Sequence, residues 1–252
     1  MSTLPPEDLQ AAQEIVKNQV IVALDHHEID QALALVDELG DRARYFKIGY
    51  RLFFKYGPRI LDEIQKREGK IFLDLKLYDI PSVVGEACAN IAAHEAIFLT
   101  TVHASGGSEM IAEALKGVKR GRREDPPRVV AVTALTSFSS RDLPELGVNA
   151  NVSEWAARLA DAALSAGADG LVSSAREVAH FRKTYGSEPF LVTPGIRLKN
   201  IKIAGDDQER TVTPREALRF GASMLVVGRP IYQAPDPVAV LDVIADSLLD
   251  TP

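Results

Sequence analysis

The chain has 252 residues, 46% hydrophobic and 25% charged, with a formal net charge of −6 at pH 7. This is an ordinary globular composition, and the acidic balance argues against a nucleic-acid-binding surface. No apolar run approaches the ~20 residues of a membrane span, and residues 1–14 lack a secretory signal pattern, so we expect a cytoplasmic protein with no membrane partner. The single cysteine, Cys88, excludes an intrachain disulfide and offers no ligand set for a cysteine-based zinc site.

Short apolar runs alternate with helical patterns along the chain. After a leading helix at 1–18, the runs predict strands at 20–25, 45–50, 70–81, 98–104, 128–135, 170–174, 190–196 and 224–228. Helices are predicted between and after them at 29–39, 58–68, 81–94, 108–119, 153–166, 177–185, 214–220 and 237–249. Residues 136–152 form the longest irregular segment of the interior.

This alternation predicts the fold class. Most of the predicted strands are apolar throughout, which is typical of parallel strands buried on both faces. With a length of about 250 residues, the pattern predicts one (β/α)8 barrel domain over 1–252, with its core at 20–233 and a final helix at 237–249. A doubly wound parallel sheet is the alternative, although neither a Gly-x-Gly-x-x-Gly turn nor a P-loop occurs in the sequence.

The third predicted strand carries three charges. Asp74 and Lys76 are two residues apart, so on a strand their side chains point to the same face. Asp79 has the opposite parity and follows where Pro81 would end the strand, so we expect it to point elsewhere, from a loop. Buried charges of this kind form either a structural ion pair or a catalytic acid–base array.

Other polar residues stand at the carboxyl ends of strands, where a barrel enzyme has its active site. Asp25, Lys47 and His103 are the charged or titratable ones, and His103 is a base, a metal ligand or a hydrogen-bonded structural residue. Gly228 and Arg229 follow the last strand, where a glycine permits close approach of an anion and an arginine can clamp it. No metal-binding motif is present in the sequence.

Seven short motifs add to this picture: Leu24-Asp25, Phe46-Lys47-Ile48-Gly49, Asp74-x-Lys76-x-x-Asp79-Ile80-Pro81, Leu135-Thr136-Ser137, Val192-Thr193-Pro194-Gly195-Ile196-Arg197, Gly205-Asp206-Asp207-Gln208 and Val227-Gly228-Arg229-Pro230. Together they resemble the signature of the orotidine 5′-phosphate decarboxylase family. They occur in the family's order between residues 20 and 233, which is nearly the whole chain.

The resemblance implies a homodimeric barrel that needs neither cofactor nor metal and converts orotidine 5′-phosphate to UMP. It implies four catalytic residues, Lys47, Asp74, Lys76 and Asp79. Lys76 would protonate the carbanion at C6 of the pyrimidine, and Asp74 would lie beside the substrate carboxylate. Asp79 would reach into the active site of the partner subunit and complete a Lys–Asp–Lys–Asp chain.

The resemblance also implies the substrate contacts. Asp25 and Lys47 would contact the ribose, and Thr136 and Ser137 would face the pyrimidine. The further contacts are Pro194 and, at the phosphate end with its closing loop, Arg197, Gln208, Gly228 and Arg229.

Two positions depart from the family pattern. Val83 stands where the family commonly has threonine, so a hydroxyl contact to the partner's ribose would be missing here. Tyr78 stands where histidine or a similar residue is frequent. Neither change touches the charged residues.

Two other functions fit the same barrel. One is a Mg²⁺-dependent sugar-phosphate enzyme, such as a keto-gulonate-phosphate decarboxylase or a hexulose-phosphate synthase, which shares the Asp-x-Lys-x-x-Asp motif but has an acidic residue on the second strand. Here that strand carries Lys47, whose charge would repel the metal. The other is a nucleotide-binding barrel that has lost catalysis, which the presence of Asp74, Lys76 and Asp79 disfavours.

Overall fold

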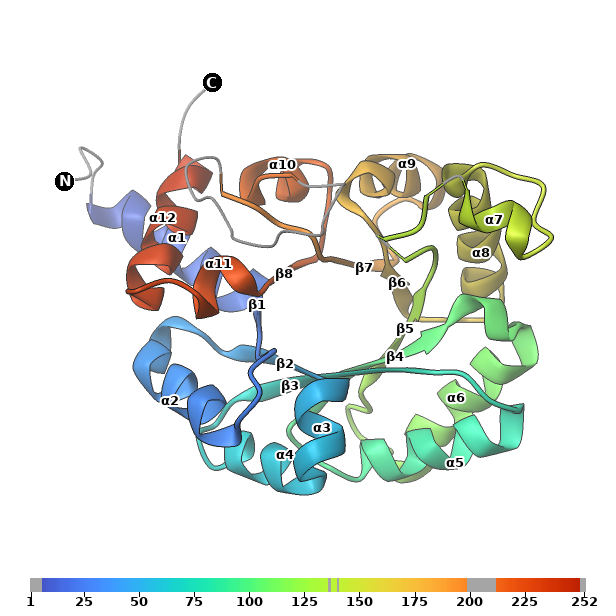
Figure 1. The fold of residues 1–252 in the computed structure, drawn as a ribbon, viewed down its shortest axis with the longest axis horizontal. Coiled ribbons are helices and arrows are strands. Elements are labelled where there is room, and N and C mark those ends of the chain that lie inside the picture. The colour runs from blue at the N-terminus through green and yellow to red at the C-terminus, as the bar shows by residue number, and fades with distance from the viewer. Residues whose placement is uncertain (1–5, 136, 140, 199–211, 250–252) are drawn as a thin grey trace.

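The computed structural model describes residues 6–135, 137–139, 141–198 and 212–249. Within these residues, eight parallel strands close into a barrel, each paired with the next along the sequence and β8 paired with β1 (Figure 1). Helices surround this ring on its outside (Figure 1). The predicted (β/α)8 barrel is therefore confirmed, and the doubly wound alternative is wrong.

The strands begin within one residue of the predicted starts. They are β1 (Val20–Ala23), β2 (Tyr45–Gly49), β3 (Lys70–Leu77), β4 (Ile97–His103), β5 (Arg128–Val132), β6 (Gly170–Val172), β7 (Phe190–Thr193) and β8 (Met224–Val227). The predicted runs continue one to four residues past these ends. Those extra residues form the loops at the carboxyl mouth of the barrel, where the polar motifs stand.

Within the described residues, the helices and 3-10 turns follow the predicted pattern with five additions, which are three short helices and two 3-10 turns. In chain order, the helices and turns are α1 (Pro6–Gln19), α2 (Ile29–Leu39), η1 (Gly40–Arg42), α3 (Tyr50–Tyr56), α4 (Pro58–Gln65), α5 (Pro81–Ala92), η2 (Ala104–Gly106), α6 (Ser108–Gly121), α7 (Asp142–Glu145), α8 (Val152–Ser165), α9 (Ala175–Tyr185), α10 (Pro214–Arg219), α11 (Arg229–Tyr232) and α12 (Pro237–Leu249). The helices α3, α7 and α11 were not predicted, because each has at most seven residues and shows too few turns for a periodic pattern.

Two layers of apolar side chains hold the barrel together. The larger layer lies between the strands and the surrounding helices. The smaller fills the barrel interior and consists of Ile21, Ala23, Phe72, Leu99, Val130, Val192, Met224 and Val226. Because Phe72 points inward, Asp74 two residues later also faces the barrel axis, one step nearer the mouth.

Strand β3 is irregular at its charged end. Leu73 pairs with Thr100 and Leu77 with Val102, so three residues of β3 stand opposite the single residue Thr101 of β4. Within this bulge Lys76 has a φ of 43°, in the left-handed region that favours glycine. The Thr101 hydroxyl oxygen accepts a hydrogen bond from the Lys76 backbone N–H at 2.8 Å and holds this conformation. Bulges of this kind re-aim a side chain beside an active site.

Helices α5 and α6 pack with their backbones in close contact. A Cβ atom at Gly117 of α6 would lie 2.1 Å from the Gly85 carbonyl oxygen and 3.0 Å from the Cys88 Cβ, both on α5. A backbone carbonyl cannot move aside as the end of a flexible side chain can. The two glycines therefore set how closely this helix pair approaches.

We expect Gly117→Ala to lower the free energy of unfolding by about 2–3 kcal/mol, because the added methyl forces the two helices apart. Urea denaturation followed by circular dichroism measures the loss. The exposed neighbour Lys116 provides the control, and Lys116→Ala should leave stability nearly unchanged. Equal effects from the two variants would contradict close packing at Gly117.

Candidate active site

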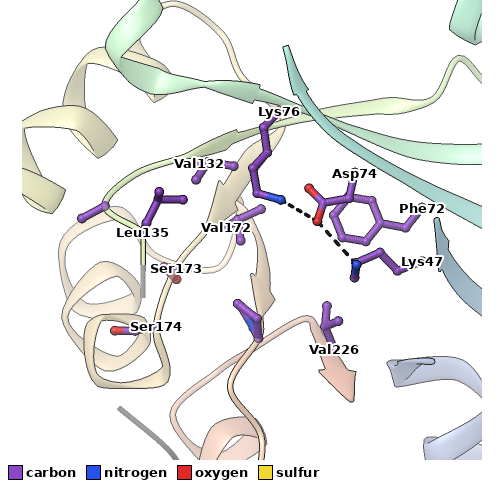
Figure 2. Close-up of a pocket in the computed structure, with 12 residues that line it drawn as sticks. Lys47, Phe72, Asp74, Lys76, Val132, Leu135, Val172, Ser173, Ser174 and Val226 are labelled. Carbon is purple, nitrogen blue, oxygen red and sulfur yellow. Dashed lines mark hydrogen bonds and ion pairs between the residues drawn. The ribbon is translucent and has the colours of Figure 1, made fainter. Parts of the chain in front are cut away.

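The centre of the site is a carboxylate held between two ammonium groups. Asp74 Oδ2 lies 2.8 Å from the Lys76 Nζ and 3.9 Å from the Lys47 Nζ, which reaches in from β2 (Figure 2). Lys47 Nζ also lies 3.0 Å from Oδ1 of Asp25, just past the end of β1. The four groups form a continuous chain, Asp25–Lys47–Asp74–Lys76, across the ends of three adjacent strands.

Thr101 completes the surroundings of Asp74. Its hydroxyl donates a hydrogen bond to Asp74 Oδ1 at 3.0 Å, while its oxygen accepts from the Lys76 backbone. One buried hydroxyl therefore fixes both the carboxylate and the backbone that carries the lysine. Thr101 is a positioning residue of the array.

Burial and charge act in opposite directions on these groups. Asp74 is only 9% exposed, and burial by itself would raise its pKa. The ammonium groups of Lys47 and Lys76, with hydrogen bonds from Lys76 and Thr101, outweigh burial and hold the pKa of Asp74 below its ordinary value. Burial would likewise lower the pKa of Lys47, but Asp25 and Asp74 outweigh it and the pKa is raised. Lys47 and Asp74 are therefore charged at neutral pH and titrate as a coupled pair.

Two cavities meet at the array. A cavity of about 160 Å³ has an apolar wall formed by Phe72, Val132, Ala134, Leu135, Val172, Pro194 and Val226 (Figure 2). A larger cavity of about 510 Å³ is polar, and Asp25, Arg51, Arg229 and Tyr232 are among its lining residues. Lys47, Asp74 and Lys76 line both cavities. A ligand with a flat apolar ring and a polar, anionic tail would fit, with its ring in the apolar cavity and its tail in the polar one.

The structure brings most of the predicted site residues to this mouth. Asp25 and Arg229 line the polar cavity and Pro194 the apolar one. A Cβ built at Gly228 would lie 3.8 Å from Oδ2 of Asp25, which puts this glycine at the edge of the polar cavity. The half-buried Arg197 follows β7 and donates a hydrogen bond to the Ile196 carbonyl at 2.9 Å.

One of the remaining predicted contacts is not beside the array, and two fall outside the described residues. Ser137 is exposed and does not line either of the two cavities. Thr136 and Gln208 lie outside the described residues.

Asp79 stands apart from the array of its own chain, as strand parity predicted. It is exposed in the loop between β3 and α5, where its Oδ1 accepts a hydrogen bond from the Ile80 N–H at 2.7 Å.

His103 lies close enough to the array for the charges of Lys76 and Asp74 to affect its pKa. Its pKa is lowered by burial and by the charge of Lys76, and its ring packs edge-on against Tyr78 at 6.0 Å.

Sequence reasoning missed Thr101 and Arg51. Thr101 had a usable signal, since it lies in a run of apolar residues and shares strand parity with His103. Arg51 had no such signal, because it lies in a short helix that was not predicted, and an arginine outside any recognised pattern is expected to be an ordinary solvated residue.

No arrangement of three or more His, Cys, Asp or Glu side chains suited to holding a metal ion occurs within the described ranges. Across the same ranges, no helix combines the length and apolar character needed to cross a membrane.

A closed parallel barrel with a buried lysine–carboxylate chain at its carboxyl mouth defines a class: barrel enzymes that act on small anionic substrates through fixed charges. Residues 18–244 match the model of the orotidine 5′-phosphate decarboxylase / HUMPS family, and the chain belongs to this family.

Similar proteins agree with this assignment. An orotidine 5′-phosphate decarboxylase of Escherichia coli O81 (strain ED1a) is 41% identical over 239 residues, which cover 94% of this chain and 96% of the relative. The crystal structure of orotidine 5′-phosphate decarboxylase from Lactobacillus acidophilus has a TM-score of 0.81 and 36% identity, covering 92% of this chain and 100% of that one. An uncharacterized conserved protein from Geobacillus kaustophilus has a TM-score of 0.79 and 31% identity, covering 91% and 99%.

Replacing Asp74 tests whether its negative charge stabilises the fold despite the cost of burying it. We expect Asp74→Asn to lower the free energy of unfolding at neutral pH by about 3 kcal/mol, because it leaves two ammonium groups without their shared carboxylate. The pKa of Asp74 is lowered in the fold, so its stabilising contribution is complete above the ordinary carboxyl pKa and is lost as pH falls through the lowered pKa. The deficit of the variant should therefore shrink with falling pH, as measured by urea denaturation at a series of pH values.

Asp37 supplies the comparison for a surface pair. It lies 2.6 Å from Arg67 and its side chain is 57% exposed, so Asp37→Asn should cost less than about 1 kcal/mol. An Asp74→Asn deficit that stays constant with pH would mean that the carboxylate charge is not what stabilises the array.

Proposed function

We propose that this chain decarboxylates orotidine 5′-phosphate to UMP and CO2, a step of de novo pyrimidine synthesis. The observation that carries the proposal is the Lys76 ammonium, 2.8 Å from the Asp74 carboxylate at the lip of an apolar cavity. Membership of the family and the decarboxylase relatives support it. The chain works as one barrel domain, and its proposed location is the cytoplasm, with no role for nucleic acid or membrane.

Decarboxylation requires a fixed positive charge beside C6 of the pyrimidine. When the bond from C6 to the carboxylate breaks, its electron pair stays on C6 and CO2 departs. The Lys76 ammonium stabilises this carbanion as it forms and then transfers a proton to C6, which yields UMP and a neutral amine that regains its proton from water. Because Asp74 and Thr101 already orient the lysine, little reorganisation is needed during the reaction.

Asp74 contributes through its negative charge. With the pyrimidine in the apolar cavity and C6 toward Lys76, the substrate carboxylate comes next to the Asp74 carboxylate. The two negative charges repel in the bound substrate, and the repulsion disappears as CO2 leaves. Lys47 keeps Asp74 ionised throughout, because its ammonium lies 3.9 Å from Oδ2 on the other side.

The remaining contacts follow the division between the two cavities. Asp25 and Lys47 hold the ribose hydroxyls in the polar cavity, whereas Pro194 packs against the pyrimidine. The family resemblance, rather than the lining of either cavity, assigns Thr136 and Ser137 to the pyrimidine edge and Arg197, Gln208, Gly228 and Arg229 to the phosphate. Binding energy from the phosphate, remote from C6, favours closure over the substrate and exclusion of water.

A second copy of the chain completes each site in this proposal. Asp79 is exposed in the loop after β3, and large apolar side chains of this loop, of α3 and of α5 are also exposed: Tyr50 47%, Phe54 76%, Tyr78 62%, Ile80 62% and Val83 47%. Tyr50 stacks on Phe54 and donates its hydroxyl to the Leu75 carbonyl at 2.7 Å, which joins these residues into one face. Apolar surface of this kind supports burial against a partner, where Asp79 would extend the chain of charges.

A Mg²⁺-dependent sugar-phosphate reaction is the competing activity within the same family. The ammonium of Lys47 lies between the carboxylates of Asp25 and Asp74, 3.0 and 3.9 Å away. It therefore occupies the position that a divalent cation would share with them. This placement favours the metal-independent decarboxylation.

The test is loss of pyrimidine absorbance after addition of orotidine 5′-phosphate, with EDTA present. The unmodified protein should turn the substrate over, and Lys76→Ala should reduce kcat/KM by at least about 10³-fold, since both charge stabilisation and proton donation are removed. UMP binding, measured by calorimetry, should remain, because the phosphate end is intact.

The exposed Lys66, paired with Glu63 on the surface, gives a lysine control whose replacement should leave turnover unchanged. Strict dependence on Mg²⁺ would favour the sugar-phosphate enzyme. Tight UMP binding without turnover by the unmodified protein would indicate a binding protein, and near-normal turnover by Lys76→Ala would refute the role of the lysine.

Mixing two inactive variants tests the shared site. In a hybrid of Asp79→Ala and Lys76→Ala subunits, one site is intact and the other lacks both groups. Random exchange of equal amounts should therefore restore about a quarter of the parent activity. Subunit exchange is confirmed with differently tagged chains, and absence of rescue after proven exchange would show that each chain builds its own site.

A further inference from the structure

The polar cavity carries more positive charge than its own carboxylates balance. Four cationic side chains line it, Lys47, Arg51, Lys76 and Arg229, against the two carboxylates Asp25 and Asp74. Both carboxylates lie within ion-pairing distance of the lysines. The lining therefore holds two more cationic than anionic side chains.

A phosphate monoester matches this excess. It carries a charge of about −1.5 to −2 at neutral pH and presents oxygens that suit the forked donors of arginine. The cavity volume of about 510 Å³ leaves room for a ribose together with its phosphate. Arg197 and Arg229 belong to the phosphate end under the proposed function, but of these two only Arg229 lines the polar cavity, and a single guanidinium there balances only part of the dianion.

Arg51 is placed to supply the second guanidinium. It lies in the first turn of α3, and its NH1 donates a hydrogen bond to the Asp25 carbonyl oxygen at 2.6 Å. This bond pulls the side chain across the end of β1, which pairs with β8. No carboxylate of the described chain lies within ion-pairing distance of Arg51, although Lys55 on the same helix pairs with Glu28 at 2.6 Å.

The cationic side chains of the polar cavity also affect the pKa of Tyr232, which lies on α11. Its phenol lies in the polar cavity, where burial and the Asp25 carboxylate raise its pKa. Arg229, Arg51 and Lys47 lower the pKa of the same phenol, and all three line the cavity that contains it.

We propose that Arg51 is a phosphate-binding residue, which clamps the 5′-phosphate of the nucleotide together with Arg229 across the mouth between β1 and β8. This rests on the proposed function for the identity of the nucleotide. The Asp25 carbonyl fixes one nitrogen of the guanidinium, and the remaining donors face the phosphate.

Arg51 has a competing structural explanation, in which it only ties α3 to the loop after β1. The two roles differ in which part of the ligand they affect. A phosphate contact matters for UMP and not for uridine, which lacks the phosphate. A tie that positions Asp25 acts on the ribose and alters the binding of both ligands alike.

The experiment is calorimetric titration of the full chain and its variants with UMP and with uridine, alongside kcat/KM for orotidine 5′-phosphate. Arg51→Gln should weaken UMP about tenfold or more, with a similar loss in kcat/KM, and leave uridine binding unchanged. Arg51→Lys keeps the charge but not the fork and should weaken UMP by a smaller factor.

Lys55→Gln is the matched control, since it removes one positive charge from the same helix outside the cavity and should leave the ratio of the two affinities unchanged. Unchanged UMP affinity in Arg51→Gln, or equal losses for UMP and uridine, would overturn the proposal. If the unmodified protein turns over orotidine 5′-phosphate while either result is found, the phosphate role of Arg51 fails and the proposed function stands.

Discussion

The shared carboxylate of Asp74 is the constraint on which the site depends. A carboxylate this deeply buried stays ionised only while positive charge surrounds it, and two lysines from adjacent strands provide that charge. Lys47 in turn stays protonated because the carboxylates of Asp25 and Asp74 lie beside it. None of the three groups can be removed without leaving an unbalanced charge at the mouth of the barrel.

The barrel places this array by simple geometry. Parallel pairing of β2, β3 and β4 brings Lys47, Asp74 and Thr101 to one end, and the inward apolar layer beneath Phe72 closes the interior below them. The apolar cavity therefore opens on one side of the charges and the polar cavity on the other. Under the proposed function, a substrate with a flat ring and an anionic tail would be held across the charges, so that binding at one end would support chemistry at the other.

The amino-acid sequence predicts the barrel well because its strands are buried on both faces and are apolar throughout. It predicts the strand ends less well, since the apolar runs continue into the loops of the mouth. Parity correctly brings Asp74 and Lys76 together and separates Asp79, but the contact is made through a bulge with a left-handed residue, which alternation along a regular strand cannot foresee. The parts of the site contributed by a single hydroxyl or by a short helix, Thr101 and Arg51, depend on tertiary packing that local pattern does not encode.

At Lys76, the left-handed backbone conformation favours a different residue from the one that the proposed chemistry requires. A residue with a side chain costs about 1–2 kcal/mol in this conformation, whereas glycine adopts it without that cost. The fold would therefore gain from glycine at the position where the proposed chemistry requires an ammonium group. Under the proposed function, lysine at this position therefore gives up part of the stability of the fold in exchange for the ammonium group.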